Sequence, residues 1–332
     1  MKKVAVVFNG GTISMKVDPI IKAAVPSLTG EEIMAMVTGI EEFAEIESYN
    51  FSNLPSPHIT PEVMLELSKY VEKLLLREDI DGIVVTHGTD SLEETAYFLA
   101  LTIASEKSIV ITGAMRSGSE LGYDGPSNLA AAICTVIYEN SKNRGVLVCL
   151  NGELHSASEV TKANSMSLNA FQTPVFGPIG IVDNNEVIFY RNSEQKLNIK
   201  IDELSAKVDL IKCVSGMDGR LIDFCVSEGD KGIVIEAMGR GNIPLEMVQG
   251  VKNAINNNIA VVIVSRCFEG RVFPSYGYEG GGKELRNLGV ILGDNMNGQK
   301  ARIKLILALS KTSNLDEVRD MFEDGFYNNI IL

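Results

Sequence analysis

A strand–turn–helix pattern over residues 82–101 constrains the fold more than any other feature of this sequence. It opens with a β-branched apolar run, typical of a buried strand, and closes with a helical pattern. Ser91 followed three residues later by Glu94 matches a capping box, which predicts that the helix begins at about Ser91. Thr89 and Asp90 would then lie on the turn between them, where open parallel sheets hold ligands. We therefore expect their hydroxyl and carboxylate to face a bound molecule.

A second turn of this kind follows the apolar run 4–8. Its sequence, Asn-Gly-Gly-Thr-Ile-Ser, places Thr12 just after a strand. Paired glycines permit positive φ and let a backbone approach a ligand closely, although a plain glycine turn has the same sequence. A phosphate loop is not expected, because neither GxxxxGK[ST] nor GxGxxG is present. Residues 15–30 show no period, so we expect a loop there, of the kind that often serves as a lid.

Strands and helices alternate along the first half of the chain, which predicts a doubly wound, mostly parallel α/β sheet. The second half repeats this alternation on a smaller scale, and a length of 332 residues favours two domains. We predict an N-terminal domain over residues 1–190, a linker over 191–207 and a smaller C-terminal α/β domain over 208–332. The predicted strands are 4–8, 82–85, 109–111, 146–150, 208–214, 232–235 and 259–264. The predicted helices are 61–74, 91–101, 129–138, 301–310 and 315–322.

Composition excludes several classes of function. A formal net charge of −13 leaves no electrostatic footprint for nucleic acid or for an anionic membrane surface. No stretch approaches the roughly 20 apolar residues that a membrane span needs. The five cysteines are widely spaced without a CxxC pair, and there are only three histidines, so neither zinc nor a disulfide framework is expected. The first apolar run is too short for a secretory signal, and together these features predict a cytoplasmic protein.

The two threonine turns indicate nucleophilic chemistry, but they do not identify the base that it requires. Threonine is a poor nucleophile at its ordinary pKa and needs a base nearby. His87 precedes a glycine on the turn, and we interpret it as structural. A lysine with a lowered pKa or a tyrosine polarised by its neighbours would also serve, and spacing alone does not choose among them.

Two signatures make the chain resemble the bacterial-type L-asparaginase family. Residues 9–14 are similar to the family signature TGGTIA, and residues 87–96 to HGTDTxxETA. The similarity runs over essentially the whole chain and includes residues 113–116, 124–128, 144–148, 161–162 and 299–302. The resemblance implies an asparaginase-like fold and the hydrolysis of L-asparagine to L-aspartate and ammonia, with a minor glutaminase activity and no cofactor. It also implies a homodimer or homotetramer.

The resemblance assigns catalytic roles to matched residues. Thr12 would be the nucleophile that forms an acyl-enzyme ester. Thr89, Asp90 and Lys162 would form the second catalytic group, in which neutral Lys162 takes a proton through Thr89. Asp90 would also pair with the α-ammonium group of the substrate.

The same carry-over implies residues that bind the substrate. Ser56 would bind the α-carboxylate, assisted by backbone N–H groups around Gly11 and Gly88. The backbone beside Thr89 and Ala114 would stabilise the developing oxyanion or hold the side-chain amide. A zwitterionic amino acid needs both an acceptor and donors, and these turns would supply them.

The chain departs from the family pattern in two places. The first signature begins with Asn9 rather than Thr or Ser, and we expect little effect on the chemistry. Many relatives carry a tyrosine in the lid that activates the threonine nucleophile, but residues 13–48 contain no tyrosine. Some relatives use a tyrosine of the C-terminal domain, a pattern that Tyr276 and Tyr278 resemble, and we predict that Tyr278 is the activator.

Three alternatives remain beside L-asparaginase. A related amidohydrolase preferring L-Gln or D-Asn is the nearest alternative, and for L-Gln the one extra methylene changes binding by only about 1–3 kcal/mol. A tRNA-dependent amidotransferase subunit is less favoured, since it would need a further N-terminal domain and the first predicted strand starts at Val4. A non-catalytic amino-acid sensor is disfavoured, because a binding protein has no need of Lys162.

Overall fold

A computed structural model of the chain describes residues 1–192 and 197–323. It contains two compact units, Met1–Asn198 and Ile199–Leu332. The first is built on a large, mostly parallel sheet and the second on a smaller parallel sheet, so the predicted fold class is confirmed. The predicted linker over 191–207 includes residues 193–196, which lie outside the described residues.

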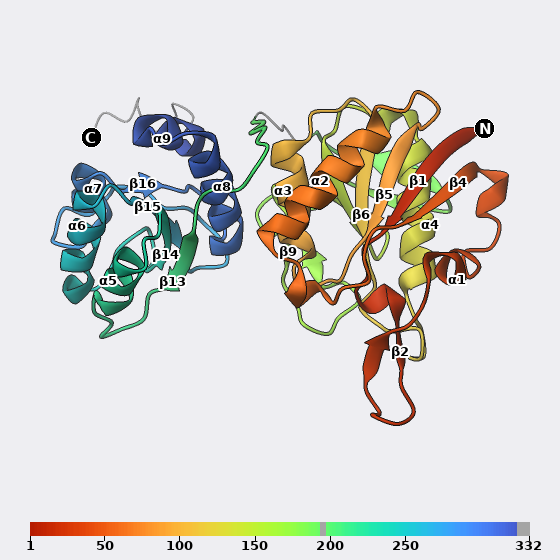
Figure 1. The fold of residues 1–332 in the computed structure, drawn as a ribbon, viewed down its shortest axis with the longest axis horizontal. Helices are drawn as coiled ribbons and strands as arrows, with labels where there is room; N and C mark the ends of the chain where they lie inside the picture. Colours follow the sequence, from red (N-terminus) through yellow and green to blue (C-terminus); the bar gives the residue numbers. More distant parts are fainter. Residues whose placement is uncertain (193–196, 324–332) are drawn as a thin grey trace. The chain divides into compact units, whose positions relative to one another are not determined.

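The N-terminal unit contains a sheet with the strand order β12-β11-β8-β7-β6-β5-β1-β4 (Figure 1). Strands β4, β1, β5, β6 and β7 are parallel, and the other three extend the sheet in antiparallel pairs. Its strands are β1 (Lys2–Phe8), β4 (Ala44–Asn50), β5 (Gly82–Thr86), β6 (Ser108–Thr112), β7 (Val146–Leu150), β8 (Glu153–Ser156), β11 (Gly180–Asp183) and β12 (Glu186–Phe189).

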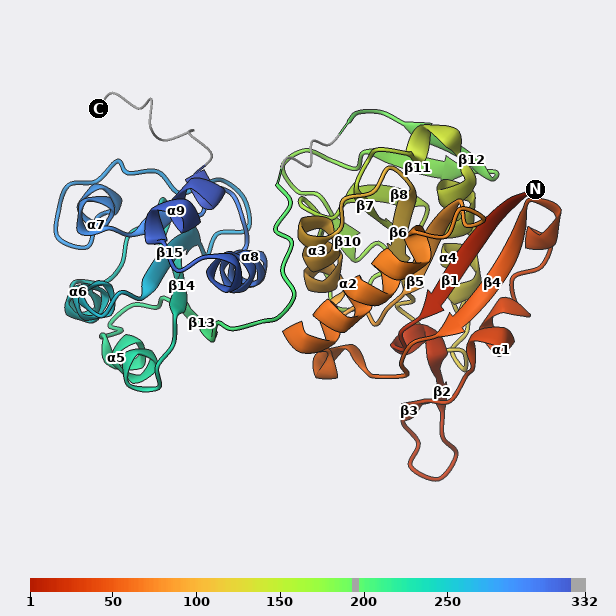
Figure 2. The same cartoon turned by 45° about the horizontal axis from the view of Figure 1, so that its top comes forward.

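Helices cover both faces of this sheet, as Figures 1 and 2 show. Successive side chains of a strand point to opposite faces, so Val7 packs in the core beside α2 (Pro61–Leu75) and α3 (Leu92–Thr102). Val6 packs in the core on the other face, beside α4 (Gly125–Ile137) and α1 (Gly30–Met34). Burial on both faces explains why the parallel strands are continuous apolar runs in the sequence. It also confirms the predicted strands in this half of the chain.

Two local predictions in this unit are wrong. Residues 15–30 are not an irregular loop, because β2 (Met15–Val17) and β3 (Ala24–Pro26) pair as an antiparallel hairpin. These strands are too short to show a period in the sequence. The predicted capping box is also absent: Ser91 precedes the helix, but its hydroxyl donates to the Ser56 carbonyl at 2.7 Å instead of capping it. A tertiary contact therefore replaces the local one.

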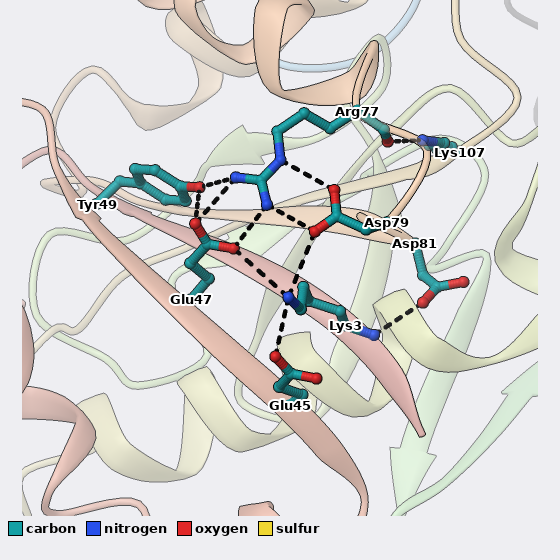
Figure 3. Close-up of polar contacts among 8 residues, drawn as sticks. All are labelled: Lys3, Glu45, Glu47, Tyr49, Arg77, Asp79, Asp81 and Lys107. Atoms are coloured by element: carbon teal, nitrogen blue, oxygen red, sulfur yellow. Dashed lines mark hydrogen bonds and ion pairs between the residues drawn. The ribbon is translucent and has the colours of Figure 1, made fainter.

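Charged side chains gather on the edge strand β4 and its surroundings (Figure 3). Lys3 lies 2.9 Å from Glu45 and 3.3 Å from Asp79, and Arg77 lies 2.9 Å from Glu47 and 2.7 Å from Asp79. The hydrogen bond from Arg77 lowers the pKa of Asp79 to about 2. Charges on an edge strand discourage pairing with another chain, which is a physical reason for this cluster.

The C-terminal unit contains a parallel sheet with the order β13-β14-β15-β16. Helices α5 and α6 pack on one face and α8 and α9 on the other. Predicted elements here match β13, β14, β15, α8 and α9, whereas α5, α6, α7 and β16 were not predicted. Among the described residues, no helix combines the length and apolar character needed to cross a membrane. The elements are β13 (Val208–Lys212), α5 (Arg220–Ser227), β14 (Gly232–Ala237), α6 (Val248–Asn256), β15 (Ala260–Ser265), α7 (Gly282–Leu288), β16 (Ile291–Leu292), α8 (Gly298–Lys311) and α9 (Leu315–Glu323).

Candidate functional site

The strand order of the N-terminal unit creates a switch point between β1 and β5. The chain runs from β1 to its neighbour on one side, β4, and then to its neighbour on the other side, β5. Open α/β sheets bind ligands where the strand order reverses, at the carboxyl ends of the strands. Phe8 pairs with Thr86, so both strands end at the same level. The turn that carries Thr12 and the turn that carries Thr89 therefore start side by side.

Glycines bring these two turns into backbone contact. Gly11 has φ of 84°, and a Cβ added there would lie 2.2 Å from the Cα and N atoms of Gly88. A Cβ added at Gly88 would lie 2.7 Å from the Ser56 hydroxyl. No other residue type fits either position without moving the backbone. The structure thus brings together the predicted residues Gly11, Gly88 and Ser56, and Thr12 follows Gly11 directly as the first residue of the 3₁₀ helix η1 (Thr12–Ser14).

Lys162 joins Thr89 and Asp90 in a hydrogen-bonded group. Its Nζ lies 2.8 Å from the Thr89 hydroxyl and 2.7 Å from the Asp90 carboxylate. Lys162 lies in β9 (Thr161–Lys162), which pairs with β10 (Phe171–Gln172). The Lys162 side chain is only 15% exposed, whereas that of Asp90 is 63% exposed. The group therefore presents a carboxylate to solvent and keeps the amine inside.

Glu93 is a residue of this group that the sequence analysis missed. It is 4% exposed, and its Oε1 accepts a hydrogen bond from the backbone N–H of Lys162 at 3.3 Å. Asp90 lies just before the N-cap of α3 and Glu93 lies in its first turn, so the start of this helix contacts both the side chain and the backbone of Lys162. An acid in the first turn of a helix is ordinary, and only the distant partner reveals this contact.

Ser56 and the Ala114 turn complete the surroundings of Thr89. Ser56 begins η3 (Ser56–His58), and its hydroxyl accepts a hydrogen bond from the Asp90 N–H at 3.2 Å. A Cβ added at Gly113 would lie 3.5 Å from the Thr89 methyl group, so the backbone that leads to Ala114 adjoins Thr89. The expected donor at Gly11 is already engaged, because its N–H donates to the Leu54 carbonyl at 3.1 Å. Gly11 therefore contributes space and shape to the site, and its N–H is paired within the protein.

His87 occupies a structural position. It is fully buried, with Nδ1 2.8 Å from the Gly88 carbonyl and Nε2 2.9 Å from the Thr95 hydroxyl. A carbonyl only accepts, so Nδ1 carries the proton and Nε2 accepts from Thr95. Burial lowers the pKa of His87 to about 4, which keeps the ring neutral near pH 7.

Tyr278, the predicted activator, lies in the C-terminal unit. It is exposed, and its ring centroid is 5.7 Å from that of Tyr276. The structure describes each unit by itself, so the assignment of Tyr278 to the Thr12 site stays a prediction.

One cluster among the described residues has the atoms to hold a metal ion. It lies in the C-terminal unit and consists of Asp209, Cys225 and Asp230, whose ligand atoms lie within 4.8 Å of one another. The ammonium group of Lys207 is 3.0 Å from Asp230 and already places a positive charge there.

A cavity of about 190 Å³ lies beside the Thr12 turn. The polar residues of its lining include Ser14, Thr29 and Asn53. The predicted catalytic residues are not part of this lining, so the hydrogen-bonded geometry, rather than the cavity, defines the candidate site.

Family models match both halves of the chain. The model described as "Asparaginase, N-terminal" matches residues 3–195, and that described as "Glutaminase/Asparaginase C-terminal domain" matches residues 207–322.

Individual proteins are similar over nearly the full length. An L-asparaginase from Bacillus licheniformis is 36% identical, over 97% of this chain and 99% of that protein. A glutamyl-tRNA(Gln) amidotransferase component from Pyrococcus abyssi is 32% identical, over 99% of this chain and 77% of that protein. The crystal structure of a probable cytoplasmic L-asparaginase from Campylobacter jejuni superposes with a TM-score of 0.90, at 34% identity, covering 97% of this chain and 99% of that one.

We predict that His87 makes the protein less stable as the pH falls. The unfolded chain binds a proton near pH 6.5, while the folded chain resists it until about pH 4. Proton binding to His87 in the unfolded chain therefore has almost no effect on the free energy of unfolding above pH 7, and it lowers that free energy by about 2 kcal/mol at pH 5. Urea denaturation at pH 7 and at pH 5 should show this loss of unfolding free energy for the wild type and not for His87→Gln. The two proteins are compared by their change with pH, so a uniform destabilisation of the variant does not matter, and equal changes would contradict the prediction.

Proposed function

We propose that this chain, which belongs to the asparaginase family, hydrolyses the side-chain amide of L-asparagine to give L-aspartate and ammonia. Membership of the family supports an amidohydrolase acting on a small-molecule substrate. The observation that carries the proposal is the 2.8 Å contact between the Lys162 amine and the Thr89 hydroxyl, at the strand ends that also carry Thr12. A binding protein has no need of a half-buried amine directed at a hydroxyl group.

In the first half-reaction, the Thr12 hydroxyl attacks the side-chain carbonyl carbon of asparagine. The new bond joins Thr12 Oγ1 to this carbon, and the proton of Thr12 is removed by a base. The tetrahedral intermediate then collapses, the C–N bond breaks, and the leaving nitrogen takes up a proton to depart as ammonia. An aspartyl ester of Thr12 remains.

In the second half-reaction, water attacks this ester, the bond between the carbonyl carbon and Thr12 Oγ1 breaks, and L-aspartate leaves while the Thr12 oxygen regains a proton. Neutral Lys162 takes a proton through the Thr89 hydroxyl, and the water becomes the nucleophile. The contact with Asp90 at 2.7 Å and the contact of Glu93 with the Lys162 backbone at 3.3 Å hold the lysine in place. Fixing the donor and acceptor before the reaction lowers the entropic cost of the step.

The same turns would bind the two charged ends of the amino acid. Asp90 is largely exposed and retains a second carboxylate oxygen for the substrate ammonium. The Ser56 hydroxyl accepts from Asp90 N–H, which leaves its own proton to donate to the substrate carboxylate. Backbone beside Gly88, Thr89 and Ala114 would hold the side-chain amide and the developing oxyanion.

The preference among amides is part of the proposal. We propose L-asparagine as the principal substrate and L-glutamine as a minor one, with no cofactor. The decisive assay measures ammonia release from L-Asn, L-Gln and D-Asn side by side. A higher kcat/KM for L-Gln or D-Asn would replace the proposed preference, and no release from any of the three would favour a sensor or an amidotransferase subunit.

We also propose that the enzyme is a cytoplasmic homodimer or homotetramer. Its five cysteines are free thiols, as expected in a reducing compartment, and the family resemblance implies an oligomer. Light scattering of the purified full chain distinguishes these assemblies from a monomer.

Replacing the proposed nucleophile should abolish turnover. Thr12→Ala removes the attacking hydroxyl, and we expect kcat to fall by about 10³-fold or more with the far-UV circular dichroism unchanged. Thr12→Ser is the matched control, because it keeps a hydroxyl and should retain measurable activity. Full activity of Thr12→Ala would remove Thr12 from the mechanism.

The proposed activator should be distinguishable from its neighbour. Tyr278→Phe removes a phenol that we propose polarises Thr12, so kcat should fall by about 10²-fold. Tyr276→Phe is the matched control on the same segment and should lower kcat much less. Equal and small effects of both substitutions would show that neither phenol activates Thr12.

A further inference from the structure

Tyr123 contacts the turn that carries Thr12. Its hydroxyl donates a hydrogen bond of 2.6 Å to the carbonyl oxygen of Ile13, the residue after Thr12. Tyr123 lies in the loop between β6 and α4 and is 110 positions away from Ile13 in the sequence. Neither the family signatures nor the proposed mechanism uses this residue.

The structure holds the Tyr123 ring in place. The half-buried ring packs against the core on the α4 face of the sheet. A Cβ added at Gly125 would lie 2.4 Å from the ring carbon that bears the hydroxyl, so the glycine leaves the space that the ring occupies. The phenol also keeps its proton, because burial and the neighbouring Asp124 raise its pKa. Tyr123 is therefore a permanent hydrogen-bond donor at a fixed position.

The turn that receives this bond is held from outside at both of its ends. The Gly11 N–H donates to the Leu54 carbonyl at 3.1 Å, and the Ser14 carbonyl accepts from the N–H groups of Ser27 and Leu28 at 2.9 Å each. The turn is a three-residue 3₁₀ helix, whose hydrogen bonds are poorer than those of an α-helix. The Ser14 N–H and hydroxyl both donate to the Gly11 carbonyl, at 2.9 and 2.8 Å, and the Met15 N–H donates to the Thr12 carbonyl. These bonds hold the two peptides that flank Thr12 from within the turn. Tyr123 adds a donor from outside the turn at the Ile13 carbonyl, between the externally held ends.

The same loop also holds the strand that follows the turn. The Gly118 N–H donates to the Met15 carbonyl at 2.9 Å, and the Ser119 hydroxyl accepts from the Val17 N–H at 3.0 Å. The loop thus makes three contacts with one continuous segment. Only the Tyr123 contact falls next to Thr12, so the loop offers an internal control for a purely structural role.

We propose that Tyr123 is a positioning residue that orients Thr12 for attack by holding the Ile13 carbonyl. This inference rests on the proposed function, since it assigns Tyr123 a role in the step that Thr12 performs. A misplacement of a reacting group by about 1 Å can cost 10²-fold in rate, and one lost hydrogen bond beside the turn gives a smaller shift. Tyr123 touches neither substrate nor the reacting atoms, so it acts only through the backbone.

The test compares two full-chain variants. Tyr123→Phe keeps the ring beside Gly125 and removes the hydroxyl, and we expect kcat to fall about tenfold while KM changes less than twofold. The pH profile of kcat should not shift, because Tyr123 acts as a neutral donor and not as a base. Ser119→Ala removes a hydrogen bond from the same loop to Val17, and its kcat should stay within twofold of the wild type.

Each outcome bears on the inference. A Tyr123→Phe enzyme with unchanged kcat, or equal losses in the two variants, would overturn it while leaving the proposed function intact. A shifted pH profile would make Tyr123 an acid or base and also overturn the positioning role. Urea midpoints of both variants exclude global unfolding as the cause. A wild-type chain that released no ammonia from the three amides would overturn the proposed function first, and this inference with it.

Discussion

The backbone contact between Gly11 and Gly88 is the constraint on which the candidate site depends. Side chains on two turns converge on one small molecule only if the turns themselves lie close together. Here a Cβ at Gly11 would lie 2.2 Å from the Gly88 backbone, so the turns touch without any intervening side chain. The parallel pairing of β1 with β5 makes both strands end at the same edge of the sheet, so the two turns begin side by side. Because the glycines have no Cβ, the backbones of the turns come into contact.

The contact between the two turns also determines which polar groups surround the Lys162 amine. The side chain of Lys162 is only 15% exposed, and removing a polar group from water costs free energy unless it is hydrogen-bonded. Thr89 and Asp90 contact the amine, and Glu93 holds the backbone of the same lysine from the buried side. Elsewhere in this unit, the ion pairs of Lys3 and Arg77 lie on the exposed edge of the sheet, where solvent screens them and they contribute less per pair. Polar contacts in this unit thus contribute differently because their burial differs.

Predictions from the sequence were most successful where a local pattern has one physical meaning. Short apolar runs rich in β-branched residues predicted β1, β5, β6 and β7, since strands buried on both faces typically have this composition. Predictions were wrong where a local pattern competes with a tertiary contact. The Ser91 hydroxyl, expected to cap α3, bonds Ser56 instead. The hairpin of β2 and β3 was missed because three-residue strands carry no period.

By itself, the sequence determined the fold class and the two turns that carry Thr12 and Thr89, because strand composition and glycine placement are local properties. It did not determine what surrounds those turns. The contacts of Lys162 with Thr89, of Glu93 with the Lys162 backbone and of Tyr123 with Ile13 span 73, 69 and 110 positions. Such partners are chosen by the order in which strands assemble in the sheet, and strand order has no local signal in the sequence. The tertiary structure therefore decided which side chains meet around the two threonines.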